Sequence, residues 1–181
     1  MKKLKDLVLL FLAAGWILQV IVLRPSTATG LVAGDCIYAR TSSAKLAASV
    51  LTCEIEGADA VLCFDRAGKE VWRRVLGAAK PGKHAKATGS NPSPVTDGTH
   101  VCVYFKSGEL AALDLESGEV AWKVNLQELF GEDTLWWDLG TSPVLTADAV
   151  VVAVMQTGPS YLAAFGRTDG NLLWKHDRDL G

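Results

Sequence analysis

A repeat of about 50 residues constrains the fold of this chain more than any other feature. Three tryptophans, Trp72, Trp122 and Trp174, are 50 and 52 residues apart. A glycine stands four positions before each of them, and these glycines are Gly68, Gly118 and Gly170. Internal repeats with a period of about 20–50 residues indicate solenoids, propellers or other arrays in which each unit buries its apolar face against its neighbours.

A second landmark recurs in register with the tryptophans. Ser-Pro-Val occurs at residues 93–95 and again at 142–144, which is 49 positions later. Ser43-Ala44-Lys45 stands 50 positions before the first copy as a degenerate version of it. These two landmarks predict three units, at about residues 43–80, 93–130 and 142–177.

Each unit reads as four short strands joined by tight turns. The middle unit predicts strands at residues 94–96, 100–106, 109–115 and 119–126, and the third unit predicts strands at 149–156, 161–167 and 171–177. Glycine suits the turns between them because it adopts positive φ angles without steric cost.

The pattern of apolar residues indicates how these strands are buried. Residues 149–155 are apolar at every position, which is typical of a strand covered on both faces. Residues 119–126 alternate, so that Val120, Trp122, Val124 and Leu126 are expected on one face. We therefore predict an all-β fold, a partial β-propeller of four-stranded antiparallel blades.

The segment at residues 112–122, which reads ALDLESGEVAW, resembles the tryptophan-docking repeats of the PQQ-like β-propellers. That family includes quinoprotein alcohol dehydrogenases, the lipoprotein of the outer-membrane assembly machine and many exported bacterial proteins. The resemblance covers residues 43–177. It implies that each tryptophan of the repeat packs between blades, against the glycine turn of a neighbour. The chain departs from the pattern in two places. In the third unit Gly166 stands where the second unit has Asp114, and the first unit is one residue shorter before Gly68.

Three units do not close a ring, because propellers have about four to eight blades. We therefore expect the chain to be the N-terminal portion of a longer protein.

Residues 1–30 are expected to lie outside the propeller, as an N-terminal apolar helix. Three lysines precede an uncharged run of 17 residues at 7–23, and Ser26-Thr27-Ala28 offers a cleavage site for signal peptidase. The run is long for a signal peptide and short for a spanning helix, so that cleaved leader and membrane anchor both remain open. Either one exports residues 31–181 to the periplasm or the cell exterior. Asp35 before Cys36 disfavours a lipoprotein.

Charge and cysteine content exclude several classes of protein. The chain has 18 Lys and Arg against 20 Asp and Glu, which argues against a nucleic-acid binder. Its four cysteines (Cys36, Cys53, Cys63 and Cys102) match no zinc pattern, although an exported chain could form disulfides. Cys63 and Cys102 lie in apolar segments and are expected to be structural.

Few other side chains suggest a chemical site. Trp136 and Trp137 could stack on a ligand or cap the space between two blades, and residues 80–86 form a basic loop that reads as a solvated linker. His100 and His176 have no nucleophile or carboxylate at motif spacing, and Asp35, Asp133 and Asp138 form no EF-hand loop. We predict no catalytic, cofactor-binding or metal-binding residue in this chain.

Two functions are compatible with these observations. The first is a non-catalytic exported propeller that serves as a scaffold for a protein or cell-envelope partner. The alternative is the N-terminal part of a quinoprotein dehydrogenase that uses PQQ and Ca²⁺. Several such alcohol dehydrogenases have a vicinal cysteine pair, which this chain lacks, and this favours the scaffold.

Overall fold

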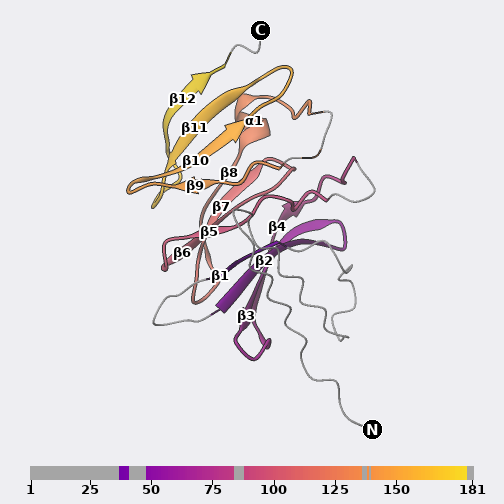
Figure 1. Cartoon of the computed structure of the whole chain (residues 1–181), viewed down its shortest axis with the longest axis vertical. Helices are drawn as coiled ribbons and strands as arrows, with labels where there is room; N and C mark the ends of the chain where they lie inside the picture. Colours follow the sequence, from indigo (N-terminus) through magenta and orange to yellow (C-terminus); the bar gives the residue numbers. More distant parts are fainter. Residues whose placement is uncertain (1–36, 41–47, 84–87, 136–137, 139, 179–181) are drawn as a thin grey trace, which may run out of the picture.

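The computed structural model describes residues 37–40, 48–83, 88–135, 138 and 140–178, with only the backbone given for 37–40. It forms three four-stranded antiparallel sheets that follow one another along the long axis of the molecule (Figure 1). The predicted N-terminal helix, Cys36, the Ser43-Ala44-Lys45 copy and the Trp136–Trp137 pair all lie outside the described residues. The prediction of an all-β fold, a partial propeller of antiparallel blades, is confirmed.

Every sheet has its strands in chain order, so each blade is a simple meander. The first sheet contains β1 (Ile37–Arg40), β2 (Ala48–Ile55), β3 (Ala58–Asp65) and β4 (Glu70–Ala78). The second contains β5 (Val95–Thr96), β6 (His100–Tyr104), β7 (Glu109–Asp114) and β8 (Val120–Asn125). The third contains β9 (Val144–Leu145), β10 (Ala149–Val154), β11 (Tyr161–Gly166) and β12 (Leu172–Asp177). The strand β1 lies ahead of residue 43, where the repeat places the start of the first unit.

Apolar side chains fill the two seams between successive sheets. Val61 and Cys63 of β3 pack with Ala111 and Leu113 of β7 in the first seam. The second seam is filled in the same way by side chains of β6, β7 and β8 on one side and of β10 and β11 on the other. The middle sheet is therefore covered on both faces, and its two central strands are apolar at residues 101–104 and 110–113.

A short helix follows β8, and its first residue, Leu126, was predicted to be the last residue of the strand. The strand ends at Asn125, whose side-chain oxygen accepts hydrogen bonds from the backbone N–H groups of Gln127 and Glu128 at 2.9 and 3.2 Å. This cap starts α1 (Leu126–Phe130). Five residues are too few to show a helical period in the sequence. None of the helices in the described ranges is long and apolar enough to cross a membrane.

A β-bulge stands directly before each tryptophan of the repeat. In the second sheet Ala112 pairs with Trp122, but Leu113 pairs with Val120, which leaves Ala121 as the extra residue. The other two sheets have the same irregularity before Trp72 and Trp174. The bulge puts Val120 on the face opposite Trp122, because each residue shares the face of its cross-strand partner. The prediction that these two side chains share a face is therefore wrong, and Val120 is 43% exposed.

Candidate functional site

The first seam is joined by a tryptophan that lies on a glycine. The ring of Trp72 covers Gly118 of the next blade so closely that a Cβ atom there would lie 2.6 Å from Cε3. Gly118 also has a φ of +69°, a conformation that other residues rarely adopt. The indole Nε1–H donates a hydrogen bond of 3.0 Å to the carbonyl oxygen of Leu115 in the same turn. Ring packing and a hydrogen bond therefore hold the same turn.

The second seam repeats this arrangement with the next pair. A Cβ atom on Gly170, whose φ is +69°, would lie 2.7 Å from the ring of Trp122. The Nε1–H of Trp122 donates to the carbonyl oxygen of Arg167 at 2.9 Å. Both tryptophans are 7% exposed.

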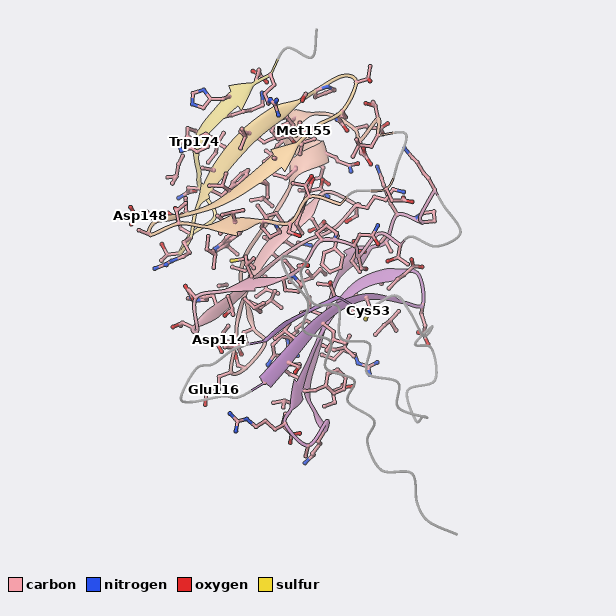
Figure 2. All side chains as sticks on the ribbon, in the orientation of Figure 1. Cys53, Asp114, Glu116, Asp148, Met155 and Trp174 are labelled. Carbon is pink, nitrogen blue, oxygen red and sulfur yellow. The ribbon has the colours of Figure 1, made fainter. Side chains whose placement is uncertain are left out.

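The third tryptophan of the repeat lies in a different environment. Trp174 is 40% exposed on β12, at the side of the third sheet that faces away from the second (Figure 2). Its ring centroid is 5.2 Å from that of His176. In the described part of the chain no glycine turn covers the ring of Trp174. Gly68, the first glycine of the repeat, has a φ of +74° and forms the corresponding turn of the first blade.

The serine–proline landmark also joins neighbouring blades. The backbone N–H of Ser93 donates to Oγ of Ser142 at 2.9 Å, so the two copies of the motif lie side by side. The strands that follow them, β5 and β9, are the short edge strands of their sheets.

A salt bridge between Asp97 and Arg167 crosses the second seam, near the turns that contain these two residues. Nε of Arg167 lies 3.4 Å from Oδ2 of Asp97, and Nδ1 of His100 lies 3.9 Å from the same atom. Burial opposes ionisation of Asp97, but the backbone N–H groups of His100 and Thr99, together with Arg167, hold the pKa of this carboxyl below its ordinary value. His100 thus lies beside the Arg167–Asp97 salt bridge, and His176 lies on β12.

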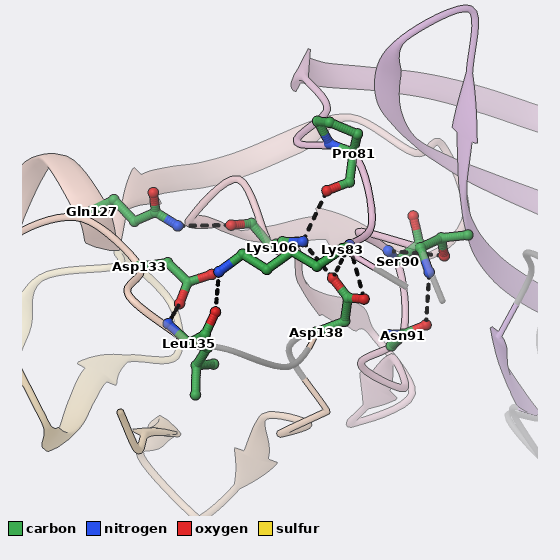
Figure 3. A network of polar contacts seen from close by, with 10 residues as sticks. Pro81, Lys83, Ser90, Asn91, Lys106, Gln127, Asp133, Leu135 and Asp138 are labelled. Atoms are coloured by element: carbon green, nitrogen blue, oxygen red, sulfur yellow. Dashed lines mark hydrogen bonds and ion pairs between the residues drawn. The ribbon is translucent and has the colours of Figure 1, made fainter. Parts of the chain in front are cut away.

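A buried lysine–aspartate pair connects the two segments that link the blades (Figure 3). Lys106 is 3% exposed, and its Nζ donates to the carbonyl oxygen of Pro81 at 2.8 Å and to Oδ1 of Asp138. The backbone N–H of Lys83 donates to both carboxylate oxygens of Asp138, at 2.8 and 3.0 Å. Within the predicted basic linker, Lys83 therefore contacts Asp138 and Pro81 contacts Lys106, while residues 84–87 lie outside the described ranges.

Further hydrogen bonds fix the surroundings of this pair. Nε2 of Gln127 donates to the carbonyl oxygen of Lys106 at 2.7 Å, and Nζ of Lys83 donates to that of Leu135. Asp133 accepts from the backbone N–H of Leu135 at 2.8 Å. No local motif in the sequence marks this network, because Lys106 and Asp138 are 32 residues apart.

Comparison with known proteins places this geometry in a family. A family model for PQQ-like repeats, described as outer membrane protein assembly factor BamB, matches residues 57–181. The chain belongs to this family of PQQ-like repeat proteins. No curated protein matches the sequence.

This PQQ-like repeat chain is similar to several solved structures at low sequence identity. A europium-containing methanol dehydrogenase is 15% identical, with a TM-score of 0.55, over 83% of this chain and 26% of that one. BamB from Moraxella catarrhalis is 19% identical, with a TM-score of 0.47, over 71% of this chain and 33% of that one. AztD from Citrobacter koseri is 12% identical, with a TM-score of 0.48, over 86% of this chain and 38% of that one. The chain thus spans about a quarter to two fifths of the length of these proteins.

A site for a quinone and a calcium ion needs a group of metal ligands and a slot for a planar ring. In the described ranges, no three His, Cys, Asp or Glu side chains lie together in a way that could hold a metal ion. A cavity of about 10 Å³ beside Lys106, between Tyr104 and Tyr161, has room for one water molecule, and an open groove of about 350 Å³ lies beside Glu109 and Glu128. Burial raises the pKa of Tyr161 to about 12, and it also raises the pKa of Tyr104.

Proposed function

We propose that this PQQ-like repeat chain is an exported, non-catalytic scaffold that presents its surface to a protein of the cell envelope. The observation that carries the proposal is that the tryptophans of the repeat and the buried charged pair make contacts within the propeller. Trp72, Trp122 and the Lys106–Asp138 pair each join one segment of the propeller to another. These contacts within the propeller support a structural role for the side chains that make them.

Two further observations support the proposal. The matching family model is described as an outer membrane protein assembly factor, which is a role in the cell envelope. The cationic start and the apolar run at residues 7–23 are typical of exported chains.

The outer strands offer a surface that a partner could use. We define the rim stripe as the exposed apolar residues at the three bulges, which are Val71, Val120, Leu172 and Leu173. They lie on β4, β8 and β12, each of which is an edge strand of its sheet. Apolar side chains that recur on successive edge strands are suited to contact with another protein.

Photo-crosslinking in cells tests the partner. A benzoylphenylalanine at Val120 is expected to form a crosslink to a discrete envelope protein, and the same residue at Glu116, in an exposed turn, serves as the matched control. Crosslinks that are absent at Val120 and at Leu172, with the protein stably expressed, would contradict this part of the proposal.

Export is tested by a fusion. Residues 1–40 joined to a reporter that is active only outside the cytoplasm are expected to give activity. An inactive reporter in a stable fusion would contradict export.

The dehydrogenase alternative is tested by titration with PQQ and Ca²⁺. We expect no saturable quenching of tryptophan fluorescence at micromolar PQQ and no dye-linked oxidation of alcohols. Saturable quenching that is lost in a Trp136→Ala/Trp137→Ala variant would favour the dehydrogenase.

A further inference from the structure

A fully buried carboxyl group crosses the first seam. Asp59 of β3 is 0% exposed, and its Oδ2 accepts a hydrogen bond of 2.5 Å from Oγ of Ser107 in the turn between β6 and β7. Its other oxygen, Oδ1, has no hydrogen-bond partner in the described part of the chain. An ionised carboxylate with a bare oxygen is costly to bury, because nothing replaces the water that it loses.

The groups around Asp59 add negative charge. Glu54 of β2 is its cross-strand neighbour, and Glu109 of β7 faces it from the second sheet. Lys123 of β8 lies 3.3 Å from Oε2 of Glu109 and donates to the carbonyl oxygen of Leu76 at 2.8 Å. Its charge therefore balances Glu109.

Among the described residues, the remaining neighbours of Asp59 bring no cation to its carboxyl group. Asn125 of β8 donates to Oε1 of Glu109 at 3.2 Å. On β4, the residue paired with Asp59 is Gly77, and Arg74 is directed to the carbonyl oxygen of Ser117. Glu128 of α1 lines a groove of about 350 Å³ together with Glu109, so it adds to the acidic character of this region.

These surroundings change the acidity of Asp59. Burial, followed by the charges of Glu109 and Glu54, raises its pKa from 3.8 to about 7, although the hydrogen bond from Ser107 opposes the shift. The surroundings of Asp59 thus favour its neutral form, which predominates below about pH 7.

The second seam lacks this group. Counting back from the cross-strand partner of each tryptophan, Asp59 is four residues before Cys63, and Gly108 is four before Ala112. Glu109 is three residues before Ala112, and the residue three before Ala164 in the third sheet is Tyr161. The two seams therefore share the tryptophan and the glycine but differ in the acidic pair.

We propose that the first seam is a proton-controlled contact, which is closed when Asp59 is protonated and is weakened when Asp59 ionises. This inference does not rest on the proposed function. It concerns the contact between the first two blades, and the second seam serves as an internal reference.

The direction of the pH dependence follows from proton linkage. The closed seam binds the proton up to about pH 7, whereas an Asp59 that is exposed to water releases it near pH 3.8. Between these values closing of the seam takes up close to one proton, so the equilibrium constant for opening the first seam rises by up to tenfold per pH unit. The stabilisation of the closed seam by the proton is fully present below about pH 4, is lost as the pH rises to about 7, and changes little beyond that.

Each seam contains its own reporter, which is the indole N–H of its tryptophan. Hydrogen exchange of Nε1–H of Trp72 and Trp122 is followed by NMR on the full chain from pH 5 to 8 and corrected for the intrinsic rate. We expect protection of Trp72 to fall by up to tenfold per pH unit up to about pH 7, while protection of Trp122 stays constant. Equal pH dependence of the two indoles would overturn the proposal.

Substitutions test whether Asp59 is the responsible group. Asp59→Asn is expected to abolish the pH dependence of Trp72 exchange, and Asp148→Asn, at an exposed turn of the third blade, is expected to leave it unchanged. If Asp59→Asn does not fold, Ser107→Ala replaces it. Loss of the Ser107 hydrogen bond, which favours the ionised form, should move the pH midpoint upward. A pH dependence that persists in Asp59→Asn, or an unmoved midpoint in Ser107→Ala, would contradict the role of Asp59.

Discussion

The indole ring of Trp72 occupies the space that a side chain at residue 118 would need, and Gly118 is the residue that leaves this space open. The same relationship joins Trp122 to Gly170 one blade later. Each tryptophan therefore depends on a glycine about 46–48 residues further along the chain. This dependence explains why the two residue types recur in step.

Gly118→Ala is expected to destabilise the protein by about 2–4 kcal/mol. The new methyl group would meet the Trp72 ring, and the φ of +69° would strain the backbone. Urea unfolding gives the loss. Gly140→Ala is the matched control, because a Cβ there meets no atom within 4 Å, and it should change stability by less than about 1 kcal/mol. Equal effects of the two substitutions would show that the ring does not depend on Gly118.

Lys106→Met is expected to cost about 3–5 kcal/mol, because it leaves the buried carboxylate of Asp138 without its cation. The double variant Lys106→Met/Asp138→Leu should recover part of this loss. Arg73→Met, which removes the exposed ion pair with Glu70, serves as the control and should cost less than about 1 kcal/mol. Thermal unfolding of the four proteins provides the comparison, and a Lys106 variant as stable as the Arg73 variant would contradict a structural role for the buried pair.

Cys63 and Cys102 are expected to resist alkylation in the folded protein at pH 8. Burial raises the pKa of the Cys63 thiol to about 11, with a smaller contribution from Asp65, and burial raises that of Cys102 to about 12. The thiolate is the reactive form, so both residues should be labelled by iodoacetamide only after unfolding in urea. Peptide mass spectrometry measures the labelling. Rapid modification of either cysteine in the native protein would show that its strand is open.

The spacing of Trp72, Trp122 and Trp174 was sufficient to predict the propeller blades, because one repeated unit must pack on the next. Strand positions followed from turn glycines and apolar runs to within one or two residues. The bulge before each tryptophan was missed, since the pairing of Val120 with Leu113 depends on register across two strands.

The polar contacts could not be predicted from local sequence. Ser107 meets Asp59 from 48 residues away, and an isolated aspartate in a strand carries no sign of its partner. One signal was available, because Asp59 and Lys106 are charged residues next to apolar runs that the repeat places in the interior. Charged residues at such positions are rarely buried without a partner.

Substitution of each repeat tryptophan by alanine tests most directly whether tryptophan–glycine seams hold the blades together. The three residues share their type and their place in the repeat, but only Trp72 and Trp122 lie on a glycine turn in the described structure. Trp72→Ala and Trp122→Ala should each cost about 3–5 kcal/mol in urea unfolding, through lost packing and a lost hydrogen bond. Trp174→Ala should cost less than about 1.5 kcal/mol, because its side chain is 40% exposed. Similar losses for all three variants would contradict the account.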